Sequence, residues 1–569
     1  MKMKAHLISR RKLAALLCTL TLFTLIVFLS GQFGLSADTD EPQYNARGIP
    51  NEDNYLKTKR RTKEVFDWNQ LEIVPEESRN KGRFIPPKRV VHLDLKGAPP
   101  KISYLLQLLP MIKKAGGTDI LIEYEDMFPH WGPLANLSAL NAYSRKDVAE
   151  LLSEADKQGL GVIPLVQTFG HLEFALKLEE FQTKLSGLPV GPMLCIFRFT
   201  SWANVVYIQV YQLGQCSRCI ERLEKANAES TGSTYYDGRY LFLQHVRRLG
   251  EMVRGLNKVP IIWDDMLRNM DKSNLKESGI GELVEPMVWV YVEDIDRFVD
   301  NTVWRTYSAV FGGVWVASAY KGAFGERLYV VNMFRHLQNH LSWLDVMYRS
   351  NMSFDVHIYL VFLFMHCTHC TVLYCTAGWS RYDHFAVQCE LLPVAVPSLV
   401  LSLAVVTSGK GDIHTIRKVQ EILKCSPQKS LMLYDELRRN PNQWDLYRCS
   451  FPGVKAFSLI SNYNTQRVEV EQLYTRLKEK DGWMSDWHVR HKFSSPWRVE
   501  ETLKTTNYLP GNVRDLEKQA KRTLGLYFDE FTVKEWMEQH LLPLSEKLAE
   551  INNMADILTK PNHWPRRPI

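Results

Sequence analysis

The chain has 569 residues, of which 45% are hydrophobic and 23% are charged, and its formal net charge is +7. This composition is that of a globular protein with room for one large domain and an appendage, or for two to three smaller domains. The modest positive charge is not gathered into Lys/Arg blocks with interleaved aromatic residues, which argues against nucleic acid as a partner.

The first segment has the pattern of a membrane signal. A basic leader at residues 1–12 precedes a stretch without charged residues that runs from Leu13 to Ala37. Its apolar core approaches the roughly 20 residues needed to cross a bilayer and is longer than that of a cleaved signal peptide. Because the positive charge lies on the leading side, the amino end is expected in the cytosol. We predict a cytosolic tail at 1–12, a transmembrane signal anchor at Leu13–Leu35 and a polar stem at 36–85.

This anchor predicts a single-pass type II membrane protein whose folded part lies in the lumen of the Golgi or of another secretory-pathway compartment. A cleaved signal is the alternative, and it would make the protein secreted or lysosomal. Asn-x-Ser sequons at Asn136 and Asn351 and a total of 10 cysteines are compatible with a luminal chain. Two C-x-x-C pairs, at 216–219 and 367–370, lie too far apart in the sequence for a zinc finger, so disulfides or core thiols are favoured and no metal is expected.

From Arg89 onward, short apolar runs alternate with amphipathic stretches. Strands are expected at 89–100, 118–127 and 162–171, and helices between them at 102–117 and 144–161, the second opened by Ser144. Further strands are expected at 205–214, 259–266, 282–291, 312–322 and 370–383. About eight such units in about 320 residues match a TIM barrel, and the glycine-rich phosphate loops of an open doubly wound sheet are absent.

After residue 410 the strand patterns stop. Charged segments with helical periodicity follow at 415–424, 464–480, 516–530 and 534–558. The predicted fold class is therefore α/β: a TIM (β/α)8 barrel at 86–410 with a helical C-terminal region at 411–569 and an N-terminal transmembrane helix. The fourth strand is a candidate for disruption, because the sequence around it departs from the rest of the pattern.

Acids and aromatic residues recur where the predicted strands end, which is where barrels of this type carry their chemistry. Any single one has a plain structural explanation, since a tryptophan usually belongs to the core and an acid after a strand often caps a helix. Their recurrence favours a sugar site, because indole rings stack on the C–H face of a sugar and carboxylates accept hydrogen bonds from its hydroxyls. The predicted substrate contacts are Asp94, His171, Trp263, Asp264, Asp265, Trp289, Tyr291, Trp379 and Arg381.

Seven blocks of the chain resemble the hexosaminidase D branch of the family 20 glycoside hydrolases, the β-N-acetylhexosaminidases. In chain order they are VVHLDLKGAPPKISYL, LIEYEDMFP, VIPLVQTFGHLEFALK, IIWDDMLR, LVEPMVWVY, VWVASAYKGA and GWSRYDHFAVQCELLP. The resemblance implies a TIM barrel that releases terminal β-linked N-acetylglucosamine or N-acetylgalactosamine from glycans without a metal or organic cofactor. It also implies that Tyr291 contacts the acetamido group of the sugar, and that Asp94 and Arg381 contact its ring hydroxyls.

The mechanism that this resemblance implies is retaining and substrate-assisted: the acetamido oxygen attacks the anomeric carbon while a Glu donates a proton and a neighbouring Asp stabilises the charged ring. The acidic pair should stand at the end of the fourth strand. Aligning Tyr211 and Gly214 with the family pattern places Ile208 and Gln209 there instead, so the pair is missing and the catalytic residues remain unidentified. A substitute acid must come within about 3 Å of the glycosidic oxygen.

The segment from Val356 to Ser380 contains no Lys, Arg, Asp or Glu and also departs from the family pattern. Altered exons or a mispredicted gene explain such abrupt changes, and a second membrane span is the alternative. For function, the alternative to a hydrolase is a catalytically inactive, membrane-anchored glycan-binding protein or scaffold.

Overall fold

The computed structural model describes residues 85–168, 170–184, 205–209, 238–361, 371–426, 434–564 and 566. The predicted cytosolic tail, the predicted membrane segment at 13–35 and the predicted stem up to residue 84 lie outside these residues. Both C-x-x-C pairs also lie outside them.

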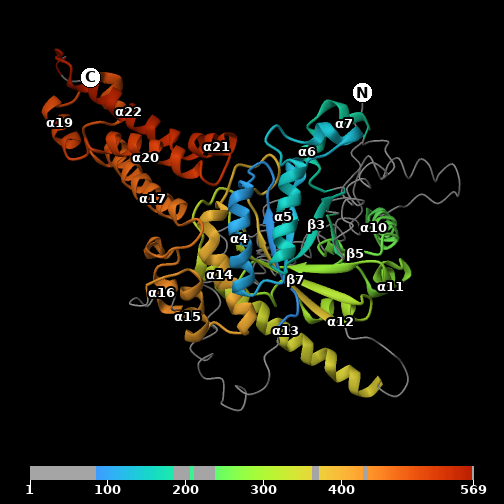
Figure 1. The fold of residues 1–569 in the computed structure, drawn as a ribbon. Helices are drawn as coiled ribbons and strands as arrows, with labels where there is room; N and C mark the ends of the chain where they lie inside the picture. The colour runs from blue at the N-terminus through green and yellow to red at the C-terminus, as the bar shows by residue number, and fades with distance from the viewer. Residues whose placement is uncertain are drawn as a thin grey trace, which may run out of the picture. The chain divides into compact units, whose positions relative to one another are not determined.

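Parallel strands form the centre of the fold and close into a barrel in chain order, from β1 to β8 (Figure 1). The strands are β1 (Arg89–Asp94), β2 (Asp119–Glu123), β3 (Gly161–Gln167), β4 (Val205–Gln209), β5 (Val259–Trp263), β6 (Glu285–Trp289), β7 (Gly313–Lys321) and β8 (Thr371–Gly378). Each pairs with the next, and β8 pairs with β1. The carboxyl ends of the strands therefore meet at one end of the barrel, where the polar residues of the sequence follow them.

Side chains fill the inside of the barrel, because alternate residues of each strand point inward. This inner core contains Val90, Leu121, Ile163, Leu165, Ile261, Met287, Trp315, Ala317 and Cys375. The neighbouring strand positions, such as Val91 and Ile122, belong to a separate and larger core between the strands and the surrounding helices. Among the described strands, side chains thus fill the barrel along its axis, which leaves its ends for a ligand.

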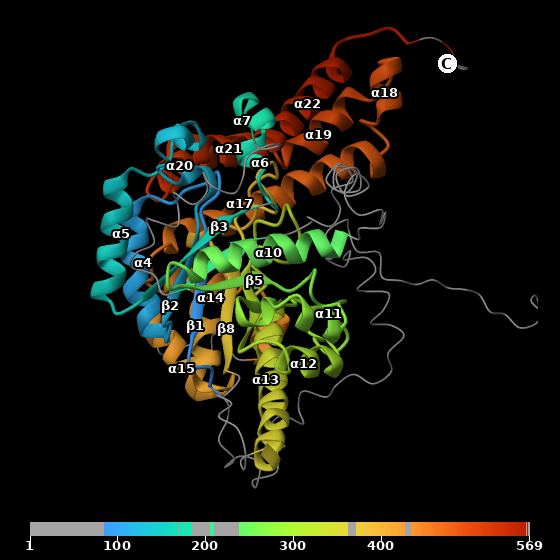
Figure 2. The same cartoon turned by 90° about the vertical axis from the view of Figure 1, so that its right-hand side faces the viewer.

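Helices cover the barrel, and those of its first half begin and end as the sequence predicts. In α5 (Arg145–Lys157), the Ser144 hydroxyl accepts a hydrogen bond from the Asp147 N–H while the Asp147 carboxylate accepts one from the Ser144 N–H. In α4 (Ile102–Ala115), Gly116 ends the helix with a φ of 109°, a left-handed conformation that suits glycine. These two helices lie side by side on one side of the barrel (Figure 2).

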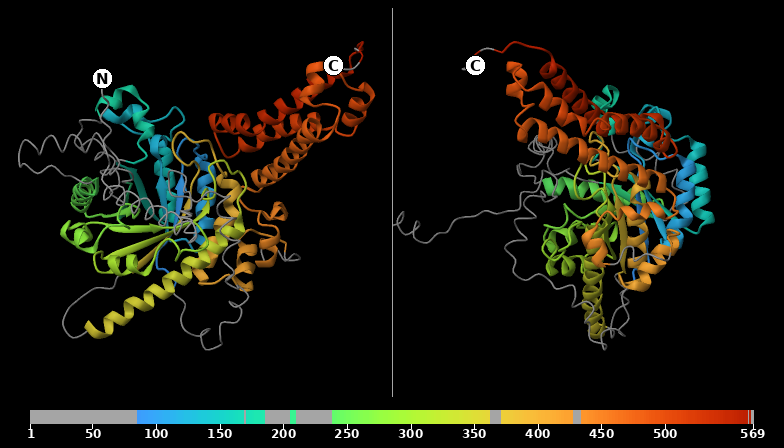
Figure 3. Two further views of the ribbon diagram at one scale, coloured as in Figure 1. Left: turned by 180° about the vertical axis from the view of Figure 1, so that it is seen from behind. Right: turned by 90° about the vertical axis from the view of Figure 1, so that its left-hand side faces the viewer.

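The remaining helices of the barrel region and of the C-terminal region follow in chain order. They are α6 (Glu173–Leu176), α7 (Glu179–Lys184), α10 (Gly238–Arg254), α11 (Lys272–Glu277), α12 (Asn301–Ser308), α13 (Met333–Val361), α14 (Leu392–Ser408), α15 (Ile413–Ile422), α16 (Tyr434–Arg439), α17 (Val454–Thr475), α18 (Asp486–His491), α19 (Pro496–Lys504), α20 (Leu509–Leu524), α21 (Glu530–His540) and α22 (Leu542–Thr559). Figure 3 shows α17, α20, α21 and α22, drawn in orange and red, packed against one another.

One helix, α14, lies between the barrel and the C-terminal helices. It packs against β7 and α4 on the barrel side and against α17 on the other side. Its residues from Leu392 to Val406 are all buried, which is typical of a helix that is apolar all round and enclosed by protein. Residues 81–569 accordingly form one compact unit.

The predicted fold class is wrong in two of its parts. Within the described ranges, no helix combines the length and the apolar character that a bilayer crossing requires, so the transmembrane helix is not supported, and its predicted segment lies outside those ranges. The fourth strand is not disrupted, because β4 forms parallel ladders with both β3 and β5. The alternative of a second membrane span near residues 356–380 is wrong as well, because β8 occupies part of that stretch and pairs with β1 and β7.

Two buried histidines of α13 face the outer side of β7. His336 Nδ1 lies 2.6 Å from the Ala319 carbonyl oxygen, and His340 Nδ1 lies 3.0 Å from Ser318 Oγ. The Nε2 atom of each ring is buried without a hydrogen-bond partner in the part of the chain that the structure describes. Burial lowers the pKa of His336 well below its ordinary value and that of His340 to about 3. Both imidazoles are therefore neutral in the folded protein.

We expect the free energy of unfolding to fall as the pH drops below about 6.5. Both histidines bind protons in the unfolded chain at that pH but not in the folded one, so the stability they contribute is present above about pH 6.5 and is lost as the pH falls towards their lowered pKa values. Each of the two histidines should lower the free energy of unfolding by up to about 1.4 kcal/mol for every unit by which the pH falls in this range. Urea titrations between pH 7.5 and pH 5 measure this slope. His340→Gln should make it shallower by about one proton, whereas the same change at the exposed His414 should not, and equal slopes in the two variants would contradict the assignment.

Candidate active site

An aromatic cluster lies at the carboxyl end of the barrel. It consists of Trp263 at the end of β5, Trp289 and Tyr291 at the end of β6, and Trp379 directly after β8. The ring centroids of Trp263 and Trp379 are 6.0 Å apart, and those of Trp289 and Tyr291 are 5.3 Å apart. Trp289 and Trp379 are half-buried, so part of this aromatic surface is open to a ligand.

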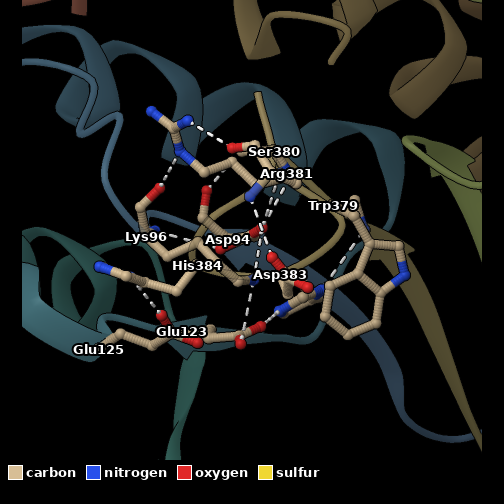
Figure 4. A network of polar contacts seen from close by, with 12 residues as sticks. Asp94, Lys96, Glu123, Glu125, Trp379, Ser380, Arg381, Asp383 and His384 are labelled. Carbon is tan, nitrogen blue, oxygen red and sulfur yellow. Dashed lines mark hydrogen bonds and ion pairs between the residues drawn. The ribbon is translucent and has the colours of Figure 1, made fainter. Parts of the chain in front are cut away.

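Beside the aromatic cluster is a network of buried charges at the ends of β1 and β2, which we call the acidic network: Asp94, Lys96, Glu123 and Glu125 (Figure 4). Lys96 Nζ lies 2.8 Å from Asp94 Oδ2 and 3.1 Å from Glu123 Oε1. The ammonium group also lies 5.1 Å from the centre of the Trp379 ring, so Lys96 joins the network to the aromatic cluster.

Lys96 controls the protonation of this network. Burial alone would lower its pKa, but the nearby carboxylates of Asp94, Glu123 and Glu125 outweigh burial and raise the pKa above its ordinary value. Burial likewise raises the pKa of Glu123, but Lys96 outweighs it, so the Glu123 pKa is lowered. The pKa of Glu125 is raised well above its ordinary value by burial, against the opposing effect of Lys96 and with the help of the carboxylate of Glu123. Glu123 is therefore ionised near pH 7, whereas burial favours the protonated form of Glu125.

Polar side chains from β1, β3 and the loop after β8 complete the network. His92 Nε2 lies 2.9 Å from Glu123 Oε2, and Gln167 Nε2 donates to Glu123 Oε1 at 2.8 Å. On the far side, His384 Nδ1 lies 3.2 Å from Glu125 Oε2. Glu125 has a φ of 47°, a left-handed conformation that costs a residue other than glycine about 1–3 kcal/mol and is concentrated at functional sites.

The two adjacent acids after β5 have different environments. Asp264 is fully buried and accepts two hydrogen bonds from the Arg268 guanidinium, at 2.9 and 2.7 Å, and one from the Tyr307 hydroxyl at 3.2 Å. Asp265 is half-buried and accepts a hydrogen bond from Trp289 Nε1, so its carboxyl group lies against the aromatic cluster. Burial raises the pKa of Asp265 to about 6, against the opposing hydrogen bond from Trp289. Asp264 holds the loop, and Asp265 faces the site.

Arg381 and Asp94, both predicted to contact ring hydroxyls, are occupied by protein partners. The five N–H groups of the Arg381 guanidinium are all donated, to the carbonyl oxygens of Lys96, Gly97 and Ala386 and to both carboxylate oxygens of Glu535 on α21. Asp94 accepts from the Ser380 N–H at 2.7 Å in addition to its ion pair with Lys96. Both residues fix the loop after β8 to the end of β1, and Arg381 also fixes that loop to α21.

The position of Trp379 depends on a close approach between the ends of β7 and β8. Gly322 has a φ of 71°, and a Cβ atom there would lie 2.1 Å from the Trp379 carbonyl oxygen. Lys321 Nζ donates to this same oxygen at 2.5 Å, and the Gly322 N–H donates to Glu390 Oε2 at 3.0 Å. Glu390 therefore has a structural place behind the aromatic cluster, and no larger residue fits at Gly322.

The structure thus brings the predicted site residues to one end of the barrel, although they serve different purposes there. The half-buried His171 follows β3, has a φ of 52°, and has its pKa lowered by burial and by Lys96. Gln209, at one of the positions where the acid pair is missing, pairs with Gln167 of β3, which places the end of β4 at the same end of the barrel.

Sequence reasoning missed two residues that organise the site, namely His92 and Arg268. His92 carried a usable signal, since it precedes Asp94 and Lys96 by two and four residues, and alternate residues of a strand share a face. Arg268 follows Asp264 by four residues, but the sequence there has no helical pattern. Nothing in the sequence therefore predicted the ion pair between these two residues. Among the described residues, no group of three or more His, Cys, Asp or Glu side chains is placed to hold a metal ion.

Comparison with known proteins gives two close relatives. The chain is 33% identical over 497 residues to hexosaminidase D of Homo sapiens, a match that covers 83% of this chain and 95% of the relative. It is 34% identical over 361 residues to hexosaminidase D of Bos taurus, which covers 59% of this chain and 97% of the relative. No family model matches the chain.

Similarity to solved structures is much lower. The β-N-acetylhexosaminidase of Bacteroides fragilis aligns with 56% of this chain and 65% of its own, at 14% identity and a TM-score of 0.37. The chitobiase of Flavobacterium johnsoniae aligns with 82% of this chain and 70% of its own, at 11% identity and a TM-score of 0.40. These values are too low to add to the argument, which rests on the two closer relatives.

We expect the two adjacent acids to differ sharply in their effect on stability. Asp264→Asn removes a buried partner of Arg268 and should lower the free energy of unfolding by about 3 kcal/mol. Asp265→Asn keeps an oxygen that can accept from Trp289 and should cost less than about 1 kcal/mol. Urea denaturation of the two variants and of the wild type measures both values. Losses of similar size would show that Asp265, too, holds the loop.

Proposed function

The chain belongs to the hexosaminidase D branch of the β-N-acetylhexosaminidases, and we propose that it removes terminal β-linked N-acetylglucosamine or N-acetylgalactosamine from glycans. The observation that carries this proposal is the aromatic cluster, which is open to a ligand at the carboxyl end of the barrel and has the carboxyl group of Asp265 beside it. Indole faces bind the C–H face of a sugar ring, and an adjacent carboxyl group can bind a hydroxyl or supply a proton.

Within this site, Trp263, Trp289 and Trp379 are proposed to enclose the terminal sugar. The Tyr291 hydroxyl can donate a hydrogen bond to the acetamido carbonyl oxygen. Burial raises the pKa of Tyr291 above its ordinary value, so the hydroxyl keeps the proton that it would donate. The protein partners of Arg381 and Asp94 give these two residues a supporting role, in which they position the loop that carries Trp379.

The reaction that fits this arrangement is retaining hydrolysis assisted by the substrate. The acetamido oxygen attacks the anomeric carbon, which removes the need for a carboxylate nucleophile from the protein. A proton donor is still required for an ordinary leaving group. Because Ile208 and Gln209 stand where the resemblance leads us to expect the Asp-Glu pair, a catalytically inactive glycan-binding protein is the second candidate.

We also propose that the protein works in an oxidising compartment of the secretory pathway. Two observations support this: Cys425 and Cys449 form a disulfide, and Asn136, in an Asn-Leu-Ser sequon, is exposed. The neutral, buried His336 and His340 favour a compartment of near-neutral pH over a lysosomal one.

The purified chain should hydrolyse a 4-nitrophenyl β-N-acetylglucosaminide or the corresponding β-N-acetylgalactosaminide. Trp379→Ala removes a stacking face shared by the aromatic cluster and the acidic network, so kcat/KM should fall by about tenfold or more, which corresponds to at least about 1.4 kcal/mol. Release of nitrophenolate measures the rate, and tryptophan fluorescence on addition of N-acetylglucosamine measures binding.

The matched control is Trp497→Ala, because Trp497 is 61% exposed on α19 and lies outside the aromatic cluster. Its kcat/KM should equal that of the wild type. Sugar binding without turnover by the wild type would favour the second candidate, whereas neither binding nor turnover would overturn both.

A further inference from the structure

The carboxyl groups at the carboxyl end of the barrel differ in whether they can reach a ligand. Within the acidic network, Asp94 and Glu123 lie in ion-pair contact with Lys96. The Glu125 side chain is 0% exposed, and its Oε2 faces His384. None of these three can present a proton to a bound sugar without breaking up the network that holds it.

The two acids that follow β5 show the same contrast more sharply. Asp264 is 0% exposed, and both of its carboxylate oxygens accept hydrogen bonds from Arg268. Asp265 is half-buried, and its Oδ1 accepts a hydrogen bond from Trp289 Nε1. Among the described residues, no Arg or Lys forms an ion pair with its carboxyl group. Asp265 is therefore a half-buried acid beside the aromatic cluster that is not committed to an ion pair.

The ladder between β4 and β5 places Asp265 next to the position of the missing acids. Tyr207 of β4 pairs with Ile261 of β5. Gln209 and Trp263 each follow this pair by two residues and end β4 and β5, which are neighbours in the barrel. Asp265 follows the end of β5 by two residues, so it stands in the turn directly after the strand adjacent to the one that should carry the acid pair.

We infer that Asp265 is the catalytic proton donor of this chain, taking the place of the acid missing from the end of β4. The inference rests on the proposed hydrolysis and names the residue that makes it possible. The Asp265 carboxyl group gives its proton to the glycosidic oxygen as the bond between that oxygen and the anomeric carbon breaks, and the bonding electrons stay on the departing oxygen. The acetamido oxygen forms a bond to the anomeric carbon. Water then attacks that carbon, releases the acetamido oxygen and returns a proton to Asp265.

The surroundings of Asp265 suit this role. Burial and the neighbouring Asp264 raise its pKa to about 6, while Trp289 and Arg268 oppose the rise. The other titratable groups that interact with it are the hydroxyls of Tyr291 and Tyr307, which burial keeps protonated. A carboxyl group with a pKa near 6 retains its proton at mildly acid pH and loses it readily enough to act as an acid.

The test compares two substrates that differ in their need for a proton: phenyl β-N-acetylglucosaminide, whose leaving group is poor, and the 2,4-dinitrophenyl glycoside, whose leaving group departs unprotonated. In the full chain, Asp265→Asn should lower kcat/KM for the phenyl glycoside by about 10²-fold to 10⁴-fold and change that for the dinitrophenyl glycoside by less than about tenfold. Asp265→Glu should recover part of the loss. The control is Asp271→Asn, a change of an exposed acid that makes no capping hydrogen bond at the start of α11, and it should leave both values unchanged.

The pH profile of the wild type tests the same point without a variant. Because the donor must be protonated, kcat/KM for the phenyl glycoside should fall as the pH rises above about 6, and that for the dinitrophenyl glycoside should not. Turnover by the wild type together with equal losses on both substrates in folded Asp265→Asn, or with no loss on either, would overturn the assignment of Asp265 and leave the hydrolase standing. The absence of turnover of both substrates by the wild type would overturn the hydrolase itself.

Discussion

The site depends on one buried ammonium group. Lys96 is 1% exposed and lies between the carboxylates of Asp94 and Glu123, at the ends of two adjacent strands. Carboxylates buried this closely could not all ionise without a cation among them, because the cost of removing each charge from water adds to their mutual repulsion. Through Asp94, the same group orders the Ser380 backbone and hence the loop that carries Trp379. The proposed stacking surface is thus positioned by a buried ion pair.

Much of the fold followed from sequence periodicity, because a strand buried on both faces reads as a continuous apolar run and a helix covering it reads as a stripe. The capping box at Ser144 and the stop at Gly116 show how local chemistry set the helix ends. The transmembrane helix was inferred from an apolar stretch behind a basic leader, and no helix among the described residues is long and apolar enough to cross a membrane. The fourth strand was doubted because its motif was absent. However, a strand needs only backbone pairing and β-branched residues such as Val205 and Val206, and these survive the loss of catalytic side chains.

The fold brings the predicted site residues to one end of the barrel, but their roles there are not readable from the sequence. Position after a strand identifies which residues can reach the carboxyl end, but not what each one binds there. Asp264 and Asp265 are neighbours in sequence, yet Arg268 engages the first while Trp289 donates to the second. Arg381 looked like a ligand for hydroxyls, and only the folded arrangement reveals that its donors are used by Glu535 and by backbone oxygens. These hydrogen bonds and ion pairs join segments that are distant in the sequence. Such long-range contacts leave no periodic pattern from which a single sequence could predict them.

The apolar helix α14 has a practical consequence for anyone who wishes to work with the barrel by itself. A protein cut near residue 410 would lose α17, which covers one side of α14, and Glu535, which holds the Arg381 guanidinium. The exposed valines and leucines of α14 would then drive self-association, and an unpaired arginine would loosen the loop that carries Trp379. Shortened forms that end near residue 410 should consequently aggregate. The barrel therefore needs its C-terminal helices to be produced as a stable protein.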